Sequence, residues 1–345
     1  MSPSVLLLPG DGIGPEVVDA ARRVLDAVRP DVATTERAVG LAALERFGVP
    51  YEDDLIEVAR AHDAILLGAV GGATHGARRT APPEAAVFAL RKELDLFTNL
   101  RPIRAIPALV SRSPLRDEYV RGVDFLLVRE LTGGLYFGDK HLGESDAFDT
   151  CAYSRVQIDR VLRAAFGLAQ GRRKRLASID KANVLRTGAL WRRCVDEMAP
   201  SYPDVEIEHL LVDNAAMQLL LRAQTFDVVV TENLFGDILS DEVSLLAGGL
   251  GMLPSASVGE GSPALYEPAH GSAPDIAGKG LANPCAAILS VALLLRHTRA
   301  DGEAALAIEA AVNAALSTGV LTRDLGGTAS TEDVTAAVLS NLSTR

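Results

Sequence analysis

Short apolar runs alternate with longer amphipathic segments along most of the chain. The apolar runs are rich in Val, Ile, Leu and Ala and occupy residues 5–8, 64–70, 125–128, 177–179 and 228–231. Each has the length of a short buried strand, and each precedes or follows a segment with helical spacing of its apolar positions. This alternation predicts an α/β fold.

Three further segments carry specific helix signals. Pro15 stands at a favoured first-turn position, and the apolar residues between 17 and 28 recur at helical spacing after it. Ser154 and Gln157 form a capping-box pattern that opens a second helix, which we expect to end near Gly171. The apolar stretch 285–295 is about half as long as the ~20 residues that cross a bilayer, so it predicts a buried helix.

Residues 133–150 are typical of strand and turn rather than helix, and they predict a projecting β arm. A dense basic run follows at 172–175. It could bind nucleic acid, but its position at a helix end favours a solvated face whose cations complement the helix dipole.

Composition narrows the classes of function. The 345 residues predict about two domains at roughly 150 residues each. The formal net charge of −11 repels phosphate backbones and anionic lipid, so neither nucleic acid nor a membrane is expected as a partner. The three cysteines lie far apart and match neither a disulfide framework nor a zinc site. With no signal-peptide pattern at the start, these features predict a cytoplasmic protein.

Two motifs suggest ion or phosphate binding. The Gly10-Asp11-Gly12-Ile13-Gly14 turn joins a strand to a helix, where backbone N–H groups can cradle a phosphate; a tight structural turn is an equal alternative. Asp237 and Asp241 are four residues apart on a predicted helix, which places both carboxylates on one face. Their hard oxygen ligands suit Mg²⁺ or Mn²⁺, and two solvated helix residues are the alternative.

Basic side chains and one loop suggest a carboxylate substrate and a nucleotide. Guanidinium groups bind carboxylates in a bidentate manner, so three arginines at 91, 101 and 129 suggest a di-acid, with structural salt bridges as the alternative. Lys181 follows an apolar strand, where burial could lower its pKa and make it a base. In the long loop 267–283, the carboxylate of Asp275 could accept both hydroxyls of a ribose.

Five segments spread over nearly the whole chain resemble the β-decarboxylating dehydrogenase family of isocitrate and isopropylmalate dehydrogenases. They are LPGDGIGPE at 8–16, RELTGGLYFG at 129–138, DKANVL at 180–185, FGDILSD at 235–241 and the loop 270–283. The resemblance implies a two-domain α/β fold of the isopropylmalate/isocitrate dehydrogenase type, distinct from the classical Rossmann fold, with mixed sheets and a β arm at about 133–150. Residues 1–98 and 249–345 would form the cofactor domain, and 99–248 the domain for dimerisation, metal and substrate.

The resemblance also implies roles for individual residues. A hydroxy-diacid substrate would contact Arg91, Arg101, Arg129, Val87, Phe88 and Val184. NAD would contact Ile13, Glu84, His270, Gly271, Ser272, Ala273, Asp275 and Asn283. Mg²⁺ or Mn²⁺ would bind Asp237 and Asp241, with K⁺ as a further candidate ion. Family members are homodimers, and Lys181 and Asp213 would serve the neighbouring subunit's site, Asp213 also as a metal ligand.

The implied activity is NAD-dependent oxidative decarboxylation of (2R,3S)-3-isopropylmalate to 4-methyl-2-oxopentanoate and CO₂, in leucine biosynthesis. Lys181, directly or through water, would remove the hydroxyl proton, and hydride would pass to NAD⁺. The divalent ion would act as a Lewis acid, and Tyr136 would protonate the carbon left by CO₂. Without the resemblance, Tyr136 would pass for a packing aromatic.

Three positions depart from the family pattern. Val87 and Phe88 stand where most isopropylmalate enzymes have two leucines. Their apolar side chains would leave a charged γ-carboxylate without a partner, which predicts a hydrophobic γ-substituent. The alternative is a paralogue acting on another 3-substituted malate, with a larger alkyl or aryl group or of the homoisocitrate or tartrate type. Glu232 is also unusual, and the sequence offers no explanation for it.

Two other classes of protein are less favoured. A solute-binding protein could clamp a di-acid, but it has no need of Lys181, Tyr136 and Asp275 together and normally carries an export signal. An inactive paralogue is disfavoured because every expected catalytic residue type is present.

Overall fold

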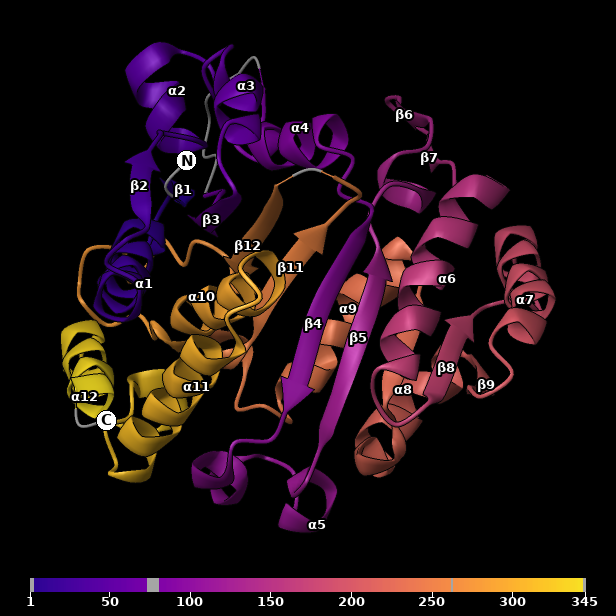
Figure 1. Ribbon diagram of the computed structural model, residues 1–345. Helices are drawn as coiled ribbons and strands as arrows, with labels where there is room; N and C mark the ends of the chain where they lie inside the picture. Colours follow the sequence, from indigo (N-terminus) through magenta and orange to yellow (C-terminus); the bar gives the residue numbers. More distant parts are fainter. Residues whose placement is uncertain (1–2, 73–80, 262, 344–345) are drawn as a thin grey trace. The chain divides into compact units, whose positions relative to one another are not determined.

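The computed structural model describes residues 3–72, 81–261 and 263–343. They form two compact units (Figure 1). The first unit comprises Met1–Leu96, Ile106–Arg112 and Gly248–Arg345, and the second comprises Phe97–Ala105 and Ser113–Ala247. The first segment of this unit ends at Leu96, two residues before the predicted boundary at 98. The unit also includes the short segment 106–112, which was predicted in the other domain.

The first unit contains five strands in the order β2-β1-β3-β12-β11. Only β11 and β12 pair antiparallel among them. The strands are β1 (Ser4–Gly10), β2 (Ala33–Glu36), β3 (Ala64–Ala69), β11 (Pro254–Val258) and β12 (Ala264–Pro268). The α-helices are α1 (Gly14–Val28), α2 (Leu41–Phe47), α3 (Leu55–Arg60), α4 (Ala85–Glu93), α10 (Cys285–Thr298), α11 (Gly302–Ser317) and α12 (Thr331–Ser343). The short 3₁₀ helices are η1 (Pro107–Arg112), η5 (Leu250–Met252) and η6 (Arg323–Leu325).

Helices cover both faces of these strands. α1 packs on β1 and β3, and α10 packs on β3, β11 and β12. On β1, Leu6 and Leu8 instead join a core cluster with Leu55 of α3 and Leu90 of α4. Because successive residues of a strand point to opposite faces, burial of both faces explains why β1 is apolar without alternation.

Five strands of the second unit lie side by side in the order β4-β5-β10-β8-β9, and among these five only β4 and β5 pair antiparallel. They are β4 (Thr98–Arg104), β5 (Asp124–Glu130), β8 (Arg175–Asp180), β9 (Glu206–Leu211) and β10 (Val228–Thr231). The α-helices are α5 (Asp117–Val120), α6 (Arg155–Gln170), α7 (Arg186–Met198), α8 (Val212–Leu221) and α9 (Asn233–Ser244). The 3₁₀ helices are η2 (Gly134–Tyr136), η3 (Ala199–Ser201) and η4 (Ala223–Thr225).

The layers of the second unit are visible in Figure 1, where α6 lies in front of its strands and α9 behind them. α6 packs on β5, β8 and β10, α7 packs on β8, and α9 packs on β5 and β10. A separate exposed hairpin consists of β6 (Lys140–Leu142) and β7 (Ala147–Asp149).

The α/β class, the mixed sheet and a β arm within residues 133–150 are confirmed. The expectation of strand or turn is wrong at Gly134–Tyr136, which form the 3₁₀ helix η2. The five apolar runs lie in β1, β3, β5, β8 and β10. The capping box of α6 is present, with Ser154 accepting from the N–H of Gln157, and α6 ends at Gln170 with Gly171 as its C-cap. The run 285–295 lies in α10 and is buried. In the described residues, no helix has both the length and the apolar character needed to cross a membrane.

The carboxyl ends of parallel strands in the second unit place the candidate side chains at one edge. Thr231 of β10 is in register with Arg129 of β5 and Ile179 of β8. The residues that follow, Lys181 after β8 and Asn233 after β10, therefore emerge at the edge where Arg129 lies. Ligands of open α/β sheets bind at this edge.

Candidate active site

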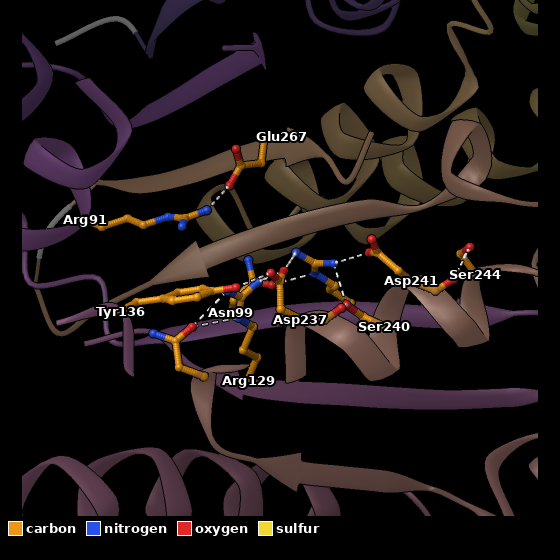
Figure 2. A network of polar contacts seen from close by, with 11 residues as sticks. Arg91, Asn99, Arg129, Tyr136, Asp237, Ser240, Asp241, Ser244 and Glu267 are labelled. Atoms are coloured by element: carbon orange, nitrogen blue, oxygen red, sulfur yellow. Dashed lines mark hydrogen bonds and ion pairs between the residues drawn. The ribbon is translucent and has the colours of Figure 1, made fainter. Parts of the chain in front are cut away.

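Arg129 is buried at the end of β5 and is held against α9. Its Nε and Nη2 donate to Oδ1 of Asn233 at 3.0 and 2.8 Å, and Nη1 donates to Oδ1 of Asp237 (Figure 2). Gly236 permits this approach, because a Cβ at that position would lie 2.7 Å from Cγ of Arg129. The glycine of the FGDILSD motif thus makes room for an arginine.

Arg101 lies on the neighbouring strand β4 and points to the same face. Asn99 is directly opposite Arg129 in the β4–β5 pair, and Arg101 is two residues further along β4. Nε of Arg101 donates to Oδ1 of Asn99 at 2.9 Å, and Nη1 donates to Oγ of Ser240 at 2.6 Å. The guanidinium also lies 3.9 Å from Asp237 and 3.5 Å from Asp241.

Asp237 and Asp241 share one face of α9, as predicted, and both face the arginines. Burial raises the pKa of Asp237, but Arg129, the Tyr136 hydroxyl and Arg101 outweigh burial and hold that pKa below its usual value. The pKa of Asp241 is raised, because burial and the charge of Asp237 exceed the attraction of Arg101. The outer aspartate, which is 58% exposed, is therefore the more weakly compensated carboxylate.

Tyr136 contacts the inner aspartate. It lies in η2, directly after the strand that carries Arg129, and its hydroxyl donates to Oδ2 of Asp237 at 2.7 Å (Figure 2). Burial, followed by the charge and hydrogen bond of Asp237, raises the pKa of the phenol. The hydroxyl therefore keeps its proton at neutral pH.

Lys181 and Asp213 form an ion pair of their own. Nζ of Lys181 lies 2.5 Å from Oδ1 of Asp213, which is 66% exposed at the start of α8. The hydrogen bond from Lys181 lowers the pKa of Asp213. Val184 is exposed one turn further along the chain, with its N–H bonded to the carbonyl of Lys181.

The described residues include no group of three His, Cys, Asp or Glu side chains able to hold a metal ion. Asp237 and Asp241 supply two carboxylates with the right oxygen chemistry for Mg²⁺ or Mn²⁺. A protein-built site of three carboxylates thus needs a further ligand beyond those that one chain brings together.

The residues predicted to contact the γ-substituent of the substrate, Val87 and Phe88, lie on α4 of the first unit together with Arg91. Nη2 of Arg91 is paired with Oε1 of Glu267 at 3.0 Å (Figure 2). Three residues before Arg91, Phe88 is 41% exposed, whereas Val87 packs against the core cluster of this unit. Glu84 precedes the helix, and its carboxylate lies over Gly71.

Three of the predicted cofactor residues line a cavity in the first unit. Its volume is about 370 Å³, within the range of small-molecule sites. Ile13, His270 and Asn283 line it, together with Gly251, Ile276, Leu281, Ala282, Arg323 and Asp324. Burial lowers the pKa of His270, so its ring is neutral, and Nδ1 contacts the carbonyl of Gly271 at 2.9 Å. Nε2 is buried, and none of the described residues forms a hydrogen bond with it.

The loop around this cavity is fastened by the N-terminal turn. The N–H of Ile13 donates to the carbonyl of Ser272 at 2.8 Å, and a Cβ on Gly12 would lie 1.9 Å from the same oxygen. The N–H groups of Asp11 and Gly14 also bond to backbone carbonyls. The phosphate-cradle alternative is therefore not supported, and this turn instead anchors the loop that carries Ala273, whose backbone has a strained φ of +38°.

Other predicted residues of this loop differ in exposure. Asp275 and Gly271 are exposed, and Ser272 is buried. The side chain of Asn283 donates to Asp324 at 3.0 Å and accepts from the N–H of Cys285. Asn283 therefore secures the start of α10 as well as lining the cavity.

The basic run 172–175 is neutralised by carboxylates. Arg172 bonds to Asp124 and Asp227, Lys174 pairs with Asp204, and Arg175 pairs with Glu206. These ion pairs connect chain segments within the second unit, so the run is structural rather than a nucleic-acid patch.

Several residues of the site were given no role from the sequence. Asn99, Asn233 and Ser240 bind the arginines, and Arg323 and Asp324 line the cofactor cavity. Asn99 and Ser240 had a usable signal, because each lies within three residues of a predicted site residue. Arg323 and Asp324 had none, since their segment is more than forty residues beyond the loop they face.

Comparison with known proteins agrees with this architecture. The family model described as "Isocitrate/isopropylmalate dehydrogenase" matches residues 4–338. The chain is 52% identical to a 3-isopropylmalate dehydrogenase of Streptococcus mutans, covering 98% of this chain and 99% of that protein. It is 49% identical to the Bacillus subtilis protein of the same name, covering 99% and 98%.

Solved structures match at similar coverage. An isocitrate dehydrogenase from Methylococcus capsulatus superposes with a TM-score of 0.89 at 36% identity, covering 99% of both chains. A β-decarboxylating dehydrogenase from Thermococcus kodakarensis gives a TM-score of 0.83 at 37% identity, covering 99% of this chain and 96% of that one.

Proposed function

The chain belongs to the isocitrate/isopropylmalate dehydrogenase family, and from this premise we propose that it oxidises and decarboxylates (2R,3S)-3-isopropylmalate with NAD, in leucine biosynthesis. The products are 4-methyl-2-oxopentanoate, CO₂ and NADH. A cytoplasmic location fits the three free cysteines.

The observation that carries the proposal is the juxtaposition of two buried arginines with two aspartates one helical turn apart. Arg101 and Arg129 face Asp237 and Asp241 within one network. These four charges balance one another. The charges of a dicarboxylate substrate and a divalent cation are also equal and opposite. The substrate therefore replaces the aspartates as partner of the arginines, and the cation replaces the arginines as partner of the aspartates. This exchange leaves no buried charge uncompensated.

Mg²⁺ or Mn²⁺, when bound, stabilises negative charge that develops on the C2 oxygen of the substrate. Asp237 and Asp241 are the residues that hold the ion, and Asp237 is ionised for that task, since its pKa lies below the usual value. The third carboxylate is Asp213 of a second subunit.

Two further side chains handle protons. Lys181, as the neutral amine, accepts the proton of the substrate hydroxyl, directly or through water. Asp213 lies 2.5 Å from its Nζ and positions the side chain. Tyr136 protonates the substrate carbon after CO₂ leaves, and its raised pKa means that it carries a proton to give.

NAD occupies the cavity of the first unit. Ile13, Leu281 and Ala282 offer apolar surface to a flat base, and the unpartnered Nε2 of neutral His270 offers an acceptor to an exocyclic amine. Asp275 is exposed on the same loop, where its carboxylate selects ribose hydroxyls and repels a 2′-phosphate.

We further propose a homodimer, because the apolar exposed positions of α8 and α9 coincide with the shared site residues. On α8, Asp213, Met217 and Leu221 recur every four residues, and both apolar side chains are more than half exposed. Ile238 on α9 and Leu245, the residue that caps its C-terminus, flank Asp241 at spacings of three and four. Residues at these spacings share one helix face.

Leu142 and Phe148 on the β arm are further exposed apolar side chains. A second copy that packs on the α8 face of the first contacts Asp213 of the first copy together with the exposed apolar side chains. Isologous packing then supplies each site with its third carboxylate from the other chain.

The test is an assay of NADH formation by the full-length chain with NAD⁺, Mg²⁺ and 3-isopropylmalate. Turnover that requires all three supports the proposal, and the absence of turnover overturns it. Comparison of kcat/KM for isopropyl-, ethyl-, benzyl- and carboxymethyl-substituted malates then identifies the γ-substituent. A preference for benzyl would favour the paralogue alternative, for which exposed Phe88 is the motivating observation.

A further inference from the structure

We propose that Asn99 and Asn233 are positioning residues, each of which fixes one substrate arginine through a neutral amide oxygen and so preserves its positive charge for a carboxylate ligand. This inference rests on the proposed function, since it assumes that Arg101 and Arg129 bind a dicarboxylate.

Both asparagines are buried and make equivalent contacts. Asn99 is 0% exposed and Asn233 is 1% exposed. Oδ1 of Asn99 accepts from Nε of Arg101 at 2.9 Å, and Oδ1 of Asn233 accepts from Nε and Nη2 of Arg129 at 3.0 and 2.8 Å. In each case the amide holds the Nε edge of the guanidinium, and Nη1 extends toward α9.

Asn233 is itself fixed in orientation. Its Nδ2 donates to the carbonyl of Gly133 at 3.2 Å, and its backbone N–H donates to the hydroxyl of Tyr153 at 3.0 Å. The Nδ2 donor assigns the other side-chain atom as oxygen, which is the atom that Arg129 needs. Ser240 gives Arg101 a second neutral acceptor at 2.6 Å.

The neutrality of these acceptors matters because the positive charge of the arginines attracts the carboxylates of the substrate. A buried arginine needs its donors satisfied, and an aspartate would satisfy them more strongly than an amide does. That aspartate would also cancel the positive potential on which a dianion depends, since charges interact strongly at low effective dielectric. An amide supplies the hydrogen bond without the cancellation.

Arg91 provides a contrast within the same protein. Its Nη2 is paired directly with the carboxylate of Glu267 at 3.0 Å. Arg129 also meets a carboxylate, since its Nη1 donates to Asp237, but its Nε edge and that of Arg101 are held by amides. In the proposed function the divalent cation binds Asp237 and Asp241, and the amides continue to hold both arginines when those carboxylates are engaged.

The test uses the isosteric substitutions Asn233→Asp and Asn99→Asp in the full-length holoenzyme. Each keeps the oxygen that binds the guanidinium and adds one negative charge. We expect KM for 3-isopropylmalate to rise at least tenfold, with KM for NAD within twofold. The melting temperature should be unchanged or higher in Asn99→Asp, whereas Asn233→Asp also loses the Nδ2 donor to Gly133 and should melt lower. A role in folding alone would lower the melting temperature and leave this KM unchanged.

Asn341→Asp on α12 is the matched control, because it changes the net charge equally outside the second unit. Asn233→Ala separates orientation from charge: we expect kcat to fall as well, because Arg129 loses its support. If Asn233→Asp does not fold, Asn99→Asp reports on the same effect through Arg101.

A KM within twofold of wild type in a folded Asn→Asp variant would overturn this inference while leaving the proposed function intact. A wild-type protein that does not turn over 3-isopropylmalate would instead overturn the proposed function. The two failures are therefore distinguishable in one set of assays.

Discussion

Tyr136 donates its hydroxyl proton to Oδ2 of Asp237 across 2.7 Å. The proposed proton donor is thus bonded to a proposed metal ligand, and the same aspartate also accepts from Arg129. Because this hydrogen bond helps to lower the pKa of Asp237, Tyr136 supports the ionised ligand before it acts as an acid.

Tyr136→Phe tests this relationship. We expect kcat to fall about 10²–10⁴-fold, the range for loss of a positioned acid. The melting temperature should stay near that of wild type, because the hydroxyl is partly exposed and the ring remains. Steady-state kinetics and thermal unfolding measure both effects, and a kcat within threefold of wild type would remove Tyr136 from the mechanism.

Mixing two inactive variants tests the sharing of residues between subunits. Lys181→Met should abolish the base, and Asp237→Asn should abolish the metal site, so each variant alone is inactive. In a mixed dimer, one site combines an intact Asp237 from one chain with an intact Lys181 from the other. With random exchange, about a quarter of wild-type activity should return.

The measurement is NADH formation after the two variants are unfolded and refolded together, with each refolded alone as the control. If both residues served the site of their own chain, the mixture would stay inactive. That result would contradict the shared site, even if sedimentation showed a dimer.

The position of Asp275 predicts cofactor choice. Asp275→Lys removes the acceptor for the ribose hydroxyls and adds a cation, so KM for NAD should rise about tenfold or more while NADP becomes a substrate. Kinetics with both cofactors check this, and KM for 3-isopropylmalate serves as the internal control. An unchanged KM for NAD would place the ribose elsewhere.

The sequence predicted those parts of the fold that follow from local pattern. β1, β3, β5, β8 and β10 were evident because strands covered on both faces are continuously apolar. β4 was missed as a strand, although it carries Arg101, since Arg and Pro interrupt its apolar residues and its burial depends on pairing with β5.

The site could be predicted as residue types but not as contacts. The spacing of Asp237 and Asp241 placed both on one face of α9, but it did not reveal that Arg101 lies against both. That contact depends on the antiparallel register of β4 and β5, which brings Asn99 opposite Arg129. The N-terminal glycine turn suggested a phosphate site because its N–H groups looked available, and long-range packing against Ser272 occupies one of them.

The structure shows where Glu232, which the sequence left unexplained, lies. It precedes α9 in the buried interior, with Oε2 at 3.8 Å from Sγ of Cys151. Burial raises the pKa of Glu232 to about 7, and the charge of Glu130 adds to this, against an opposing contribution from the Cys151 thiol. The carboxyl therefore keeps its proton in the folded protein at pH values where the unfolded chain has lost it.

This difference predicts pH-dependent stability. A group whose pKa is raised on folding contributes its full stabilisation at pH values below its pKa in the unfolded chain, which is near 4.5 for Glu232. This stabilisation is lost as the pH rises to about 7. Glu232→Gln cannot ionise and avoids that loss. The variant should therefore match wild type at pH 4.5 and exceed it above pH 7 by about 1–3 kcal/mol in free energy of unfolding.

Urea unfolding at pH 4.5, 6, 7 and 8.5 measures the difference, with Glu57→Gln on the exposed side of α3 as the control. The gain should appear between pH 4.5 and 7 and then level off, because ionisation of Glu232 is complete above its folded pKa. A constant difference at all pH values would mean that the amide changes packing rather than charge. If Glu232→Gln gained stability over wild type only at acidic pH, the pH dependence would be opposite to the one expected. That result would contradict a protonated Glu232 in the folded protein.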